Sequence, residues 1–176
     1  MHKLFNLTTV ACGAALGMIV AGILALVGGT YAKDVVHDQL VPQKIFFPQK
    51  GEELPANLNE HAGEQVDTAA EAKAFADDYI GLHLEGIGGG KSYSEVSGEF
   101  MKNPNDKELA QQRQTLFMGE TLRGTLLSAW GWGTVGTIAS IAGIALIVIG
   151  AILLLIPLLA LRGRRERAGA GAPATA

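Results

Sequence analysis

The sequence contains very little cysteine. Cys12 is the only cysteine among 176 residues, so the chain cannot form an internal disulfide. The residues before it, TVA, lack the Leu or Val expected three positions ahead of a lipidated cysteine. We therefore interpret Cys12 as a small packing residue and not as a site of lipid attachment.

Charged residues are absent from two stretches, Leu4 to Ala32 and Gly124 to Leu161, which are 29 and 38 residues long. Crossing the hydrocarbon core of a bilayer takes about 20 helical residues, and backbone groups in lipid must be hydrogen-bonded internally. Both stretches are therefore predicted to be transmembrane helices. The expected fold class is an all-α membrane protein, in which these helices flank a small extracytoplasmic helical domain.

The distribution of charge predicts the topology. Residues 33–123 carry nine basic and sixteen acidic side chains, a net charge of −7, whereas the two ends carry five basic and one acidic, a net charge of +4. Basic residues favour the cytoplasmic side, so we expect both termini in the cytoplasm and the acidic middle outside the plasma membrane. A cleavable signal peptide is the alternative for the first span, and it leaves the middle outside as well. The predicted segments are a cytoplasmic N-terminus (1–8), a first span (9–32), an extracytoplasmic cap (33–132), a second span (133–161) and a basic, disordered cytoplasmic tail (162–176).

The cap is predicted to contain a helix that begins at a capping box formed by Thr68 and Glu71. Apolar residues recur at helical spacing from Ala72 to His83, and Gly86 is the expected left-handed cap. His83 is interpreted as a core histidine bonded to the backbone, with pH sensing as the alternative.

A second long helix is expected to begin at Asn105 or Asp106 and to run into the membrane. Trp130 and Trp132 are expected to anchor its outer membrane interface, as tryptophan belts do. Residues 49–65 are expected to form a loop, and residues 91–104 a short segment broken by glycine and proline.

Residues 86–92, GIGGGKS, look like a phosphate-binding loop but have the wrong spacing. The motif G-x-x-x-x-G-K-[ST] needs a glycine five residues before Gly90, where the sequence has Glu85. The stretch also follows a predicted helix, whereas the motif follows a strand and opens a helix. We therefore expect no nucleotide binding, and we interpret the glycines as a chain reversal.

Residue types needed for other chemistry are scattered. His61 and Glu64 lie three residues apart in a predicted loop, without a third ligand nearby in sequence, so no metal, no cofactor and no enzymatic activity are expected. Neither span contains an ionisable group in its apolar core, which argues against a proton pump or channel. The acidic cap argues against nucleic-acid binding.

Small residues form stripes on both predicted spans. Gly13 and Gly17 make a G-x-x-x-G pair, while Gly136, Gly143 and Gly150 recur every seven residues. Such stripes let membrane helices approach closely. We predict that they are packing faces, either between the two spans or between chains.

Four stretches resemble a family of actinobacterial membrane proteins of uncharacterised function. The resemblance implies two spans around an extracytoplasmic segment. Some members carry the label of aromatic-ring-opening dioxygenase, which this sequence does not support because it lacks a constellation of metal ligands. The stretches are QLVPQKIFFP (39–48), AKAFADDYIGLHL (72–84), KSYSEVS (91–97) and LFMGETLRGTLLSAWGW (116–132).

The sequence thus predicts a non-enzymatic protein of the cell envelope that acts as an interaction, scaffolding or accessory subunit. Its expected partners are the lipid bilayer and either further copies of itself or a larger membrane complex. The candidate contact residues are the apolar group Ile45, Phe46 and Phe47 and the pair Glu120 and Arg123. Burial in the cap's own core and an ordinary salt bridge are the respective alternatives. A sensor or ligand-binding cap is the alternative function.

Overall fold

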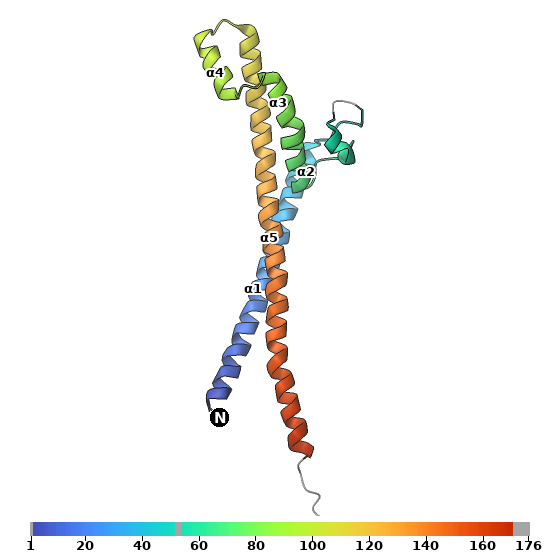
Figure 1. The fold of residues 1–176 in the computed structure, drawn as a ribbon, viewed down its shortest axis with the longest axis vertical. Helices are drawn as coiled ribbons and strands as arrows, with labels where there is room; N and C mark the ends of the chain where they lie inside the picture. The colour runs from blue at the N-terminus through green and yellow to red at the C-terminus, as the bar shows by residue number, and fades with distance from the viewer. Residues whose placement is uncertain (1, 52–53, 171–176) are drawn as a thin grey trace, which may run out of the picture. The chain divides into compact units, whose positions relative to one another are not determined.

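The computed structural model describes residues 2–51 and 54–170, and most of them are helical (Figure 1). The described part contains no strand, apart from a single bridge between Phe46 and Gln65. The two longest helices are α1 (His2–Leu40) and α5 (Lys107–Ala170). Each contains a segment long and apolar enough to cross a membrane, so the predicted all-α class with two such helices is confirmed.

The chain divides into two compact units. The first comprises residues up to 30 together with those from 137 onward, and the second comprises residues 31–136. The predicted boundaries of the cap, at 33 and 132, lie within a few residues of these divisions. Residues 162–170, expected to be disordered, belong to helix α5, and residues 171–176 of the predicted tail lie outside the described residues.

In the first unit, α1 and α5 approach each other at glycines. A Cβ atom placed on Gly22 would lie 2.6 Å from the carbonyl oxygen of Gly143, and one placed on Gly150 would lie 2.8 Å from that of Ala15. Such short contacts are not tolerated, so only glycine allows the two backbones to come this close. Gly143 and Gly150 of the predicted stripe therefore pack within the chain, and Gly22 joins them.

The other glycines of the predicted stripes have different surroundings. Within the described part of the chain, a Cβ atom on Gly13 or Gly17 would meet no atom within 4 Å. Gly136 is buried and belongs to the second unit. The G-x-x-x-G pair on α1 is thus left outside the contact between the two helices.

The second unit is built from short helices packed on the last turns of the first helix and the first half of the last. Local sequence accounts for most of their ends: α1 ends just before Pro42, which disfavours helix in the residue that precedes it, and Asp106 caps α5 through the N–H of Leu109 at 3.0 Å. The remaining elements are η1 (Val41–Gln43), η2 (Ala56–His61), α2 (Ala69–Ala74), η3 (Phe75–Ile80), α3 (Gly81–Gly88) and α4 (Tyr93–Lys102).

Two capping boxes begin α2 and α4. The predicted box at Thr68 and Glu71 is confirmed, since each side chain bonds the other residue's backbone N–H. Ser92 and Glu95 form the same arrangement at α4. The expectation of a short broken segment over 91–104 was therefore wrong, because the capping box offsets the cost of Gly98 in the helix. The loop expected over 49–65 likewise contains the short helix η2.

The π-helical segment η3 changes the phase of the helix that runs through α2 and α3. The N–H of Gly81 bonds the carbonyl of Ala76, five residues earlier, so this turn is wider than an α turn. After it, the buried stripe continues at Leu84 and Gly88 instead of at His83. The left-handed cap is also at Gly89, with φ 60°, and not at Gly86 as expected.

The core of the second unit lies between α5 and the run α2–η3–α3, which extends beside it (Figure 1). Glycines on α5 allow this contact: a Cβ atom on Gly119 would lie against the Leu84 side chain, and one on Gly133 against that of Ala69. The buried side chains from the long helices and the connecting segments are Val36, Leu40, Phe47, Leu54, Leu58, Val66, Leu116 and Leu126.

Candidate functional site

The predicted pair Glu120 and Arg123 belongs to a polar cluster that joins η3 to α5. Arg123 donates to the Asp77 carboxylate at 3.1 Å and lies 3.6 Å from that of Glu120. Lys73 also donates to Asp77. Asp77 thereby receives two cations, and Arg123 connects elements 46 residues apart in sequence.

The surroundings of Asp77 favour its ionised form. The hydrogen bond from Lys73, together with that from Arg123, lowers the pKa of the Asp77 carboxyl below its ordinary value, against the opposing effect of burial. The carboxylate is therefore a permanent anion at neutral pH. This arrangement fixes the π-helical turn on α5, which is a structural role.

The two predicted interface tryptophans differ in their surroundings. Trp130 is partly covered, and the Lys73 ammonium lies 5.3 Å from its ring centroid, a cation–π contact. Trp132 is 63 % exposed. Of the two, Trp132 has the ring available for a contact outside the chain.

The apolar group at residues 45–47 is divided between core and surface. Phe47 is buried and packs its ring against Phe75 at 5.1 Å. Ile45 is partly buried against the same core. Phe46, in contrast, is 53 % exposed, so it is the member of this group with most of its surface available to a partner.

One face of α5 points away from the buried residues Leu116 and Leu126. Between Phe117 and Trp132 this face is exposed and carries no charge. We name this surface the outer face of α5. It consists of six exposed residues, Phe117, Met118, Thr121, Leu122, Thr125 and Trp132. The hydroxyls of Thr121 and Thr125 bond the carbonyls of Phe117 and Leu122 of the same helix, each at 2.7 Å. Since these hydroxyls turn back to the helix, the face is effectively apolar.

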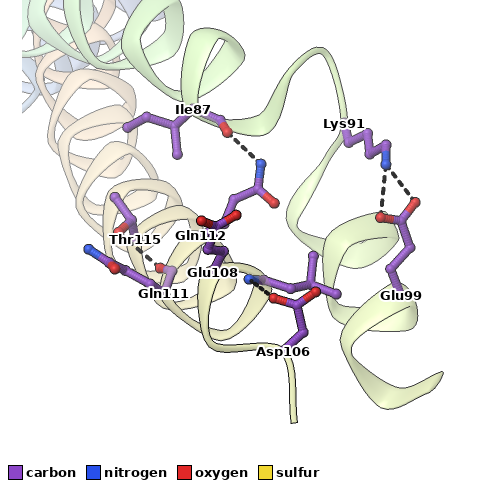
Figure 2. Close-up of a pocket in the computed structure, with 9 residues that line it drawn as sticks. Ile87, Lys91, Glu99, Asp106, Glu108, Gln111, Gln112 and Thr115 are labelled. Atoms are coloured by element: carbon purple, nitrogen blue, oxygen red, sulfur yellow. Dashed lines mark hydrogen bonds and ion pairs between the residues drawn. The ribbon is translucent and has the colours of Figure 1, made fainter. Parts of the chain in front are cut away.

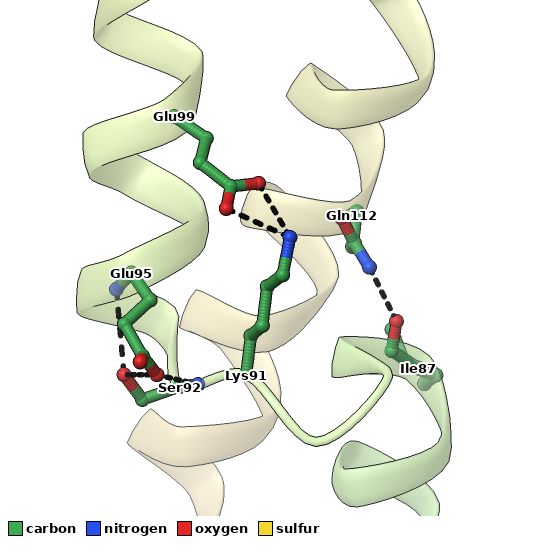
Figure 3. Close-up of polar contacts among 6 residues, drawn as sticks. All are labelled: Ile87, Lys91, Ser92, Glu95, Glu99 and Gln112. Atoms are coloured by element: carbon green, nitrogen blue, oxygen red, sulfur yellow. Dashed lines mark hydrogen bonds and ion pairs between the residues drawn. The ribbon is translucent and has the colours of Figure 1, made fainter.

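A recess of about 700 Å³ lies among the ends of α3, α4 and α5 (Figure 2). Gln112 donates to the carbonyl oxygen of Ile87 at 2.6 Å, and Lys91 pairs with both oxygens of Glu99 at 2.7 and 2.8 Å (Figure 3). Lys91 therefore links the turn made by Gly89 and Gly90 to α4. The polar groups of the recess are largely engaged with one another.

A third cluster has the residue types that bind metals. His61, Glu64 and Glu71 each offer one ligand atom, and these atoms lie within 4.8 Å of one another. The sequence placed His61 beside Glu64 but gave no sign of Glu71, because the two segments meet only through the folding of residues 62–68. The Glu71 carboxylate accepts the N–H groups of Asp67 and Thr68 at 3.0 and 2.9 Å.

Comparison with known proteins identifies no relative. No protein-family model matches the chain, and neither a curated protein nor a solved structure matches it. The resemblance stated from the four sequence stretches therefore stays an expectation, and the function has to be argued from the geometry.

Proposed function

We propose that this chain is a non-enzymatic membrane protein of the cell envelope, whose central unit lies outside the cytoplasm and binds a helix of another membrane protein. The observation that carries the proposal is the outer face of α5, which is exposed, apolar and without charge over several turns. A monomeric protein seldom leaves such a face in water.

The membrane assignment is supported by the surroundings of the apolar segments. Only 11 % of the most apolar window of α1 and 17 % of that of α5 is buried. A core helix of a water-soluble protein would be covered on most of its apolar surface. A lipid bilayer would cover these exposed apolar side chains. The backbone groups would need no further partners in lipid, because the helix hydrogen-bonds them internally.

The glycine contacts and the charges support one proposed position for the bilayer. Lys3 precedes Gly22 by 19 residues, and Arg162 follows Gly143 by 19, while Lys33 and Trp132 are each 11 residues away on the other side. Each helix therefore has 30 residues between its polar markers, about 45 Å at about 1.5 Å per residue. A bilayer with its headgroups is about 40–45 Å thick.

The same count supports a position outside lipid for the part of the outer face that precedes Trp132. Met118 precedes Trp132 by 14 residues, about 21 Å along the helix. If Trp132 marks the outer interface, Phe117, Met118 and Leu122 stand beyond the headgroups. These three side chains would then be buried by a protein partner, because water offers no other apolar surface to pack against.

A charge placed on this face tests the proposal. Met118→Glu should abolish co-purification of the partner from native membranes in mild detergent, since it would bury an unpaired carboxylate in the contact. Met101→Glu is the matched control, because Met101 is 78 % exposed on α4, away from the outer face. Equal recovery of the partner with both variants would contradict the proposal, and recovery of a homo-oligomer alone would identify the partner as a second copy.

The recess at the ends of α3, α4 and α5 favours a second candidate, a sensor or ligand-binding unit. Its lining combines polar and apolar surface, which suits a small compound that carries both kinds of group. Under this candidate, native mass spectrometry of the purified chain should find a bound compound that Gln112→Trp removes. Absence of bound mass in the wild-type chain would exclude it.

A further inference from the structure

The three potential ligands beside α2 come from two separate segments. His61 ends η2, Glu64 follows it in the connecting segment, and Glu71 lies in the first turn of α2. We propose that His61, Glu64 and Glu71 bind a divalent transition-metal ion of the Zn²⁺ class, which fastens the segment before α2 to the start of that helix.

Two of the three ligands are already held in place. The His61 ring stacks on the buried Phe47 ring, with centroids 5.0 Å apart and planes 20° from parallel. The Glu71 carboxylate is fixed by the N–H groups of Asp67 and Thr68, both of which bond Oε2. The lone pairs of its other oxygen are left for a metal. A site with preset ligands loses less conformational entropy on binding.

The three ligand atoms are near enough to share a small ion once the side chains move together by about 1 Å. Zn²⁺ takes nitrogen and oxygen ligands at about 2.0–2.2 Å in tetrahedral geometry, so two ligand atoms on one ion are about 3.4 Å apart. The three atoms lie within 4.8 Å, and His61 Nδ1 is 3.1 Å from Glu64 Oε2. Binding would therefore draw the more distant ligand atoms together by up to about 1.4 Å, and the half-exposed side chain of Glu64 is able to move.

The ligand types select the class of ion. Imidazole nitrogen suits Zn²⁺ and its neighbours, whereas Ca²⁺ and Mg²⁺ prefer sites made wholly of oxygen. Burial raises the pKa of the Glu71 carboxyl, but the hydrogen bonds from Asp67 and Thr68 outweigh it and hold that pKa below its ordinary value. Glu71 is therefore ionised at neutral pH, as a metal ligand must be.

The competing explanation is a cluster held by a protonated histidine. His61 Nδ1 faces Glu64, and its Nε2 lies 3.8 Å from the Glu60 carboxylate, so an imidazolium would pair with both. The two explanations predict different results for Zn²⁺ binding. They also differ in the role of Glu60, which is outside the three-ligand set.

The test is calorimetric titration of ZnCl₂ into the full chain in mild detergent, after EDTA treatment and without a histidine tag. We expect one ion per chain, release of protons where His61 is protonated, and no comparable binding of Ca²⁺ or Mg²⁺. Glu64→Gln should weaken Zn²⁺ binding by roughly tenfold or more, since even outer-shell partners of metal ligands are worth about 10–100-fold. Glu64 is exposed enough for this variant to fold.

Glu60→Gln is the matched control and should bind Zn²⁺ as the wild-type chain does. Zn²⁺ binding that is absent from the wild-type chain, or equal in the wild type and Glu64→Gln, would overturn the proposal. An imidazolium cluster alone would give no Zn²⁺ binding, and both glutamate variants would then lower thermal stability at pH 6. The metal ligands and the outer face of α5 are different residues, so this outcome is independent of the partner experiment.

Discussion

At the scale of single residues, Asp77 is held by two cations, because Lys73 and Arg123 both donate to it. We expect Asp77→Asn to lower the free energy of unfolding of the second unit by about 1 kcal/mol, because both cations lose their anion at a partly exposed position. Near-UV circular dichroism during denaturation measures this. Asp78→Asn is the control and should change stability by less than about 0.5 kcal/mol.

The lowered pKa values of Glu71, Glu95 and Asp77 predict how stability depends on pH. Hydrogen bonds from backbone N–H groups lower the pKa of the two glutamates, and that from Lys73 lowers the pKa of Asp77. A folded-state pKa below the unfolded value adds stability that is complete above the unfolded value and is lost as pH falls. Thermal stability should therefore be level near pH 7 and decline below about pH 4.5. A decline that is already complete near pH 6 would contradict this expectation.

At the scale of helical elements, the glycine contact between α1 and α5 predicts a difference between two similar substitutions. Gly143→Leu should destabilise the helix pair by about 1–3 kcal/mol, because its side chain would enter the backbone of α1 near Leu26. Gly17→Leu should leave the pair unchanged, since its added Cβ meets no atom nearby. Thermal unfolding in detergent compares them. Equal losses would mean that Gly17 also packs within the chain.

The capping box of α4 predicts a second pair of variants. Ser92→Ala should speed amide hydrogen exchange in the first turn of α4, with a loss of about 1 kcal/mol in local stability, because the Glu95 N–H would lose its acceptor. Ser94→Ala is the matched control, being exposed two residues along the same helix. Identical exchange in both variants would show that packing, and not the cap, determines this turn.

The helix starts that are determined by nearby side chains could be predicted from the sequence. The capping box at Thr68 and the start of α5 after Asp106 both follow from side chains within four positions. The π turn at η3 and the approach of Glu71 to His61 could not be predicted this way. The π turn packs against α5 through Arg123, which is distant in sequence, and Glu71 reaches His61 only through the folding of residues 62–68.

At the scale of the whole molecule, the proposed topology predicts which residues a membrane-impermeant maleimide reaches in intact cells. On a Cys12→Ser background, Lys50→Cys should be labelled from outside, because Lys50 lies in the acidic central unit. Arg162→Cys should be labelled only after the membrane is opened. Labelling of Arg162→Cys in intact cells would contradict the proposed orientation.

The π-helical turn of η3 also has a consequence for comparing this chain with future relatives. A π turn holds one residue more than an α turn, so a relative could lose one residue between Phe75 and Ile80 and keep an unbroken helix there. An alignment without a gap would then pair every later residue of the relative with the wrong position. A leucine that such an alignment pairs with Leu84 would face solvent. We expect correct alignments of such chains to place a single-residue gap within η3, opposite Arg123.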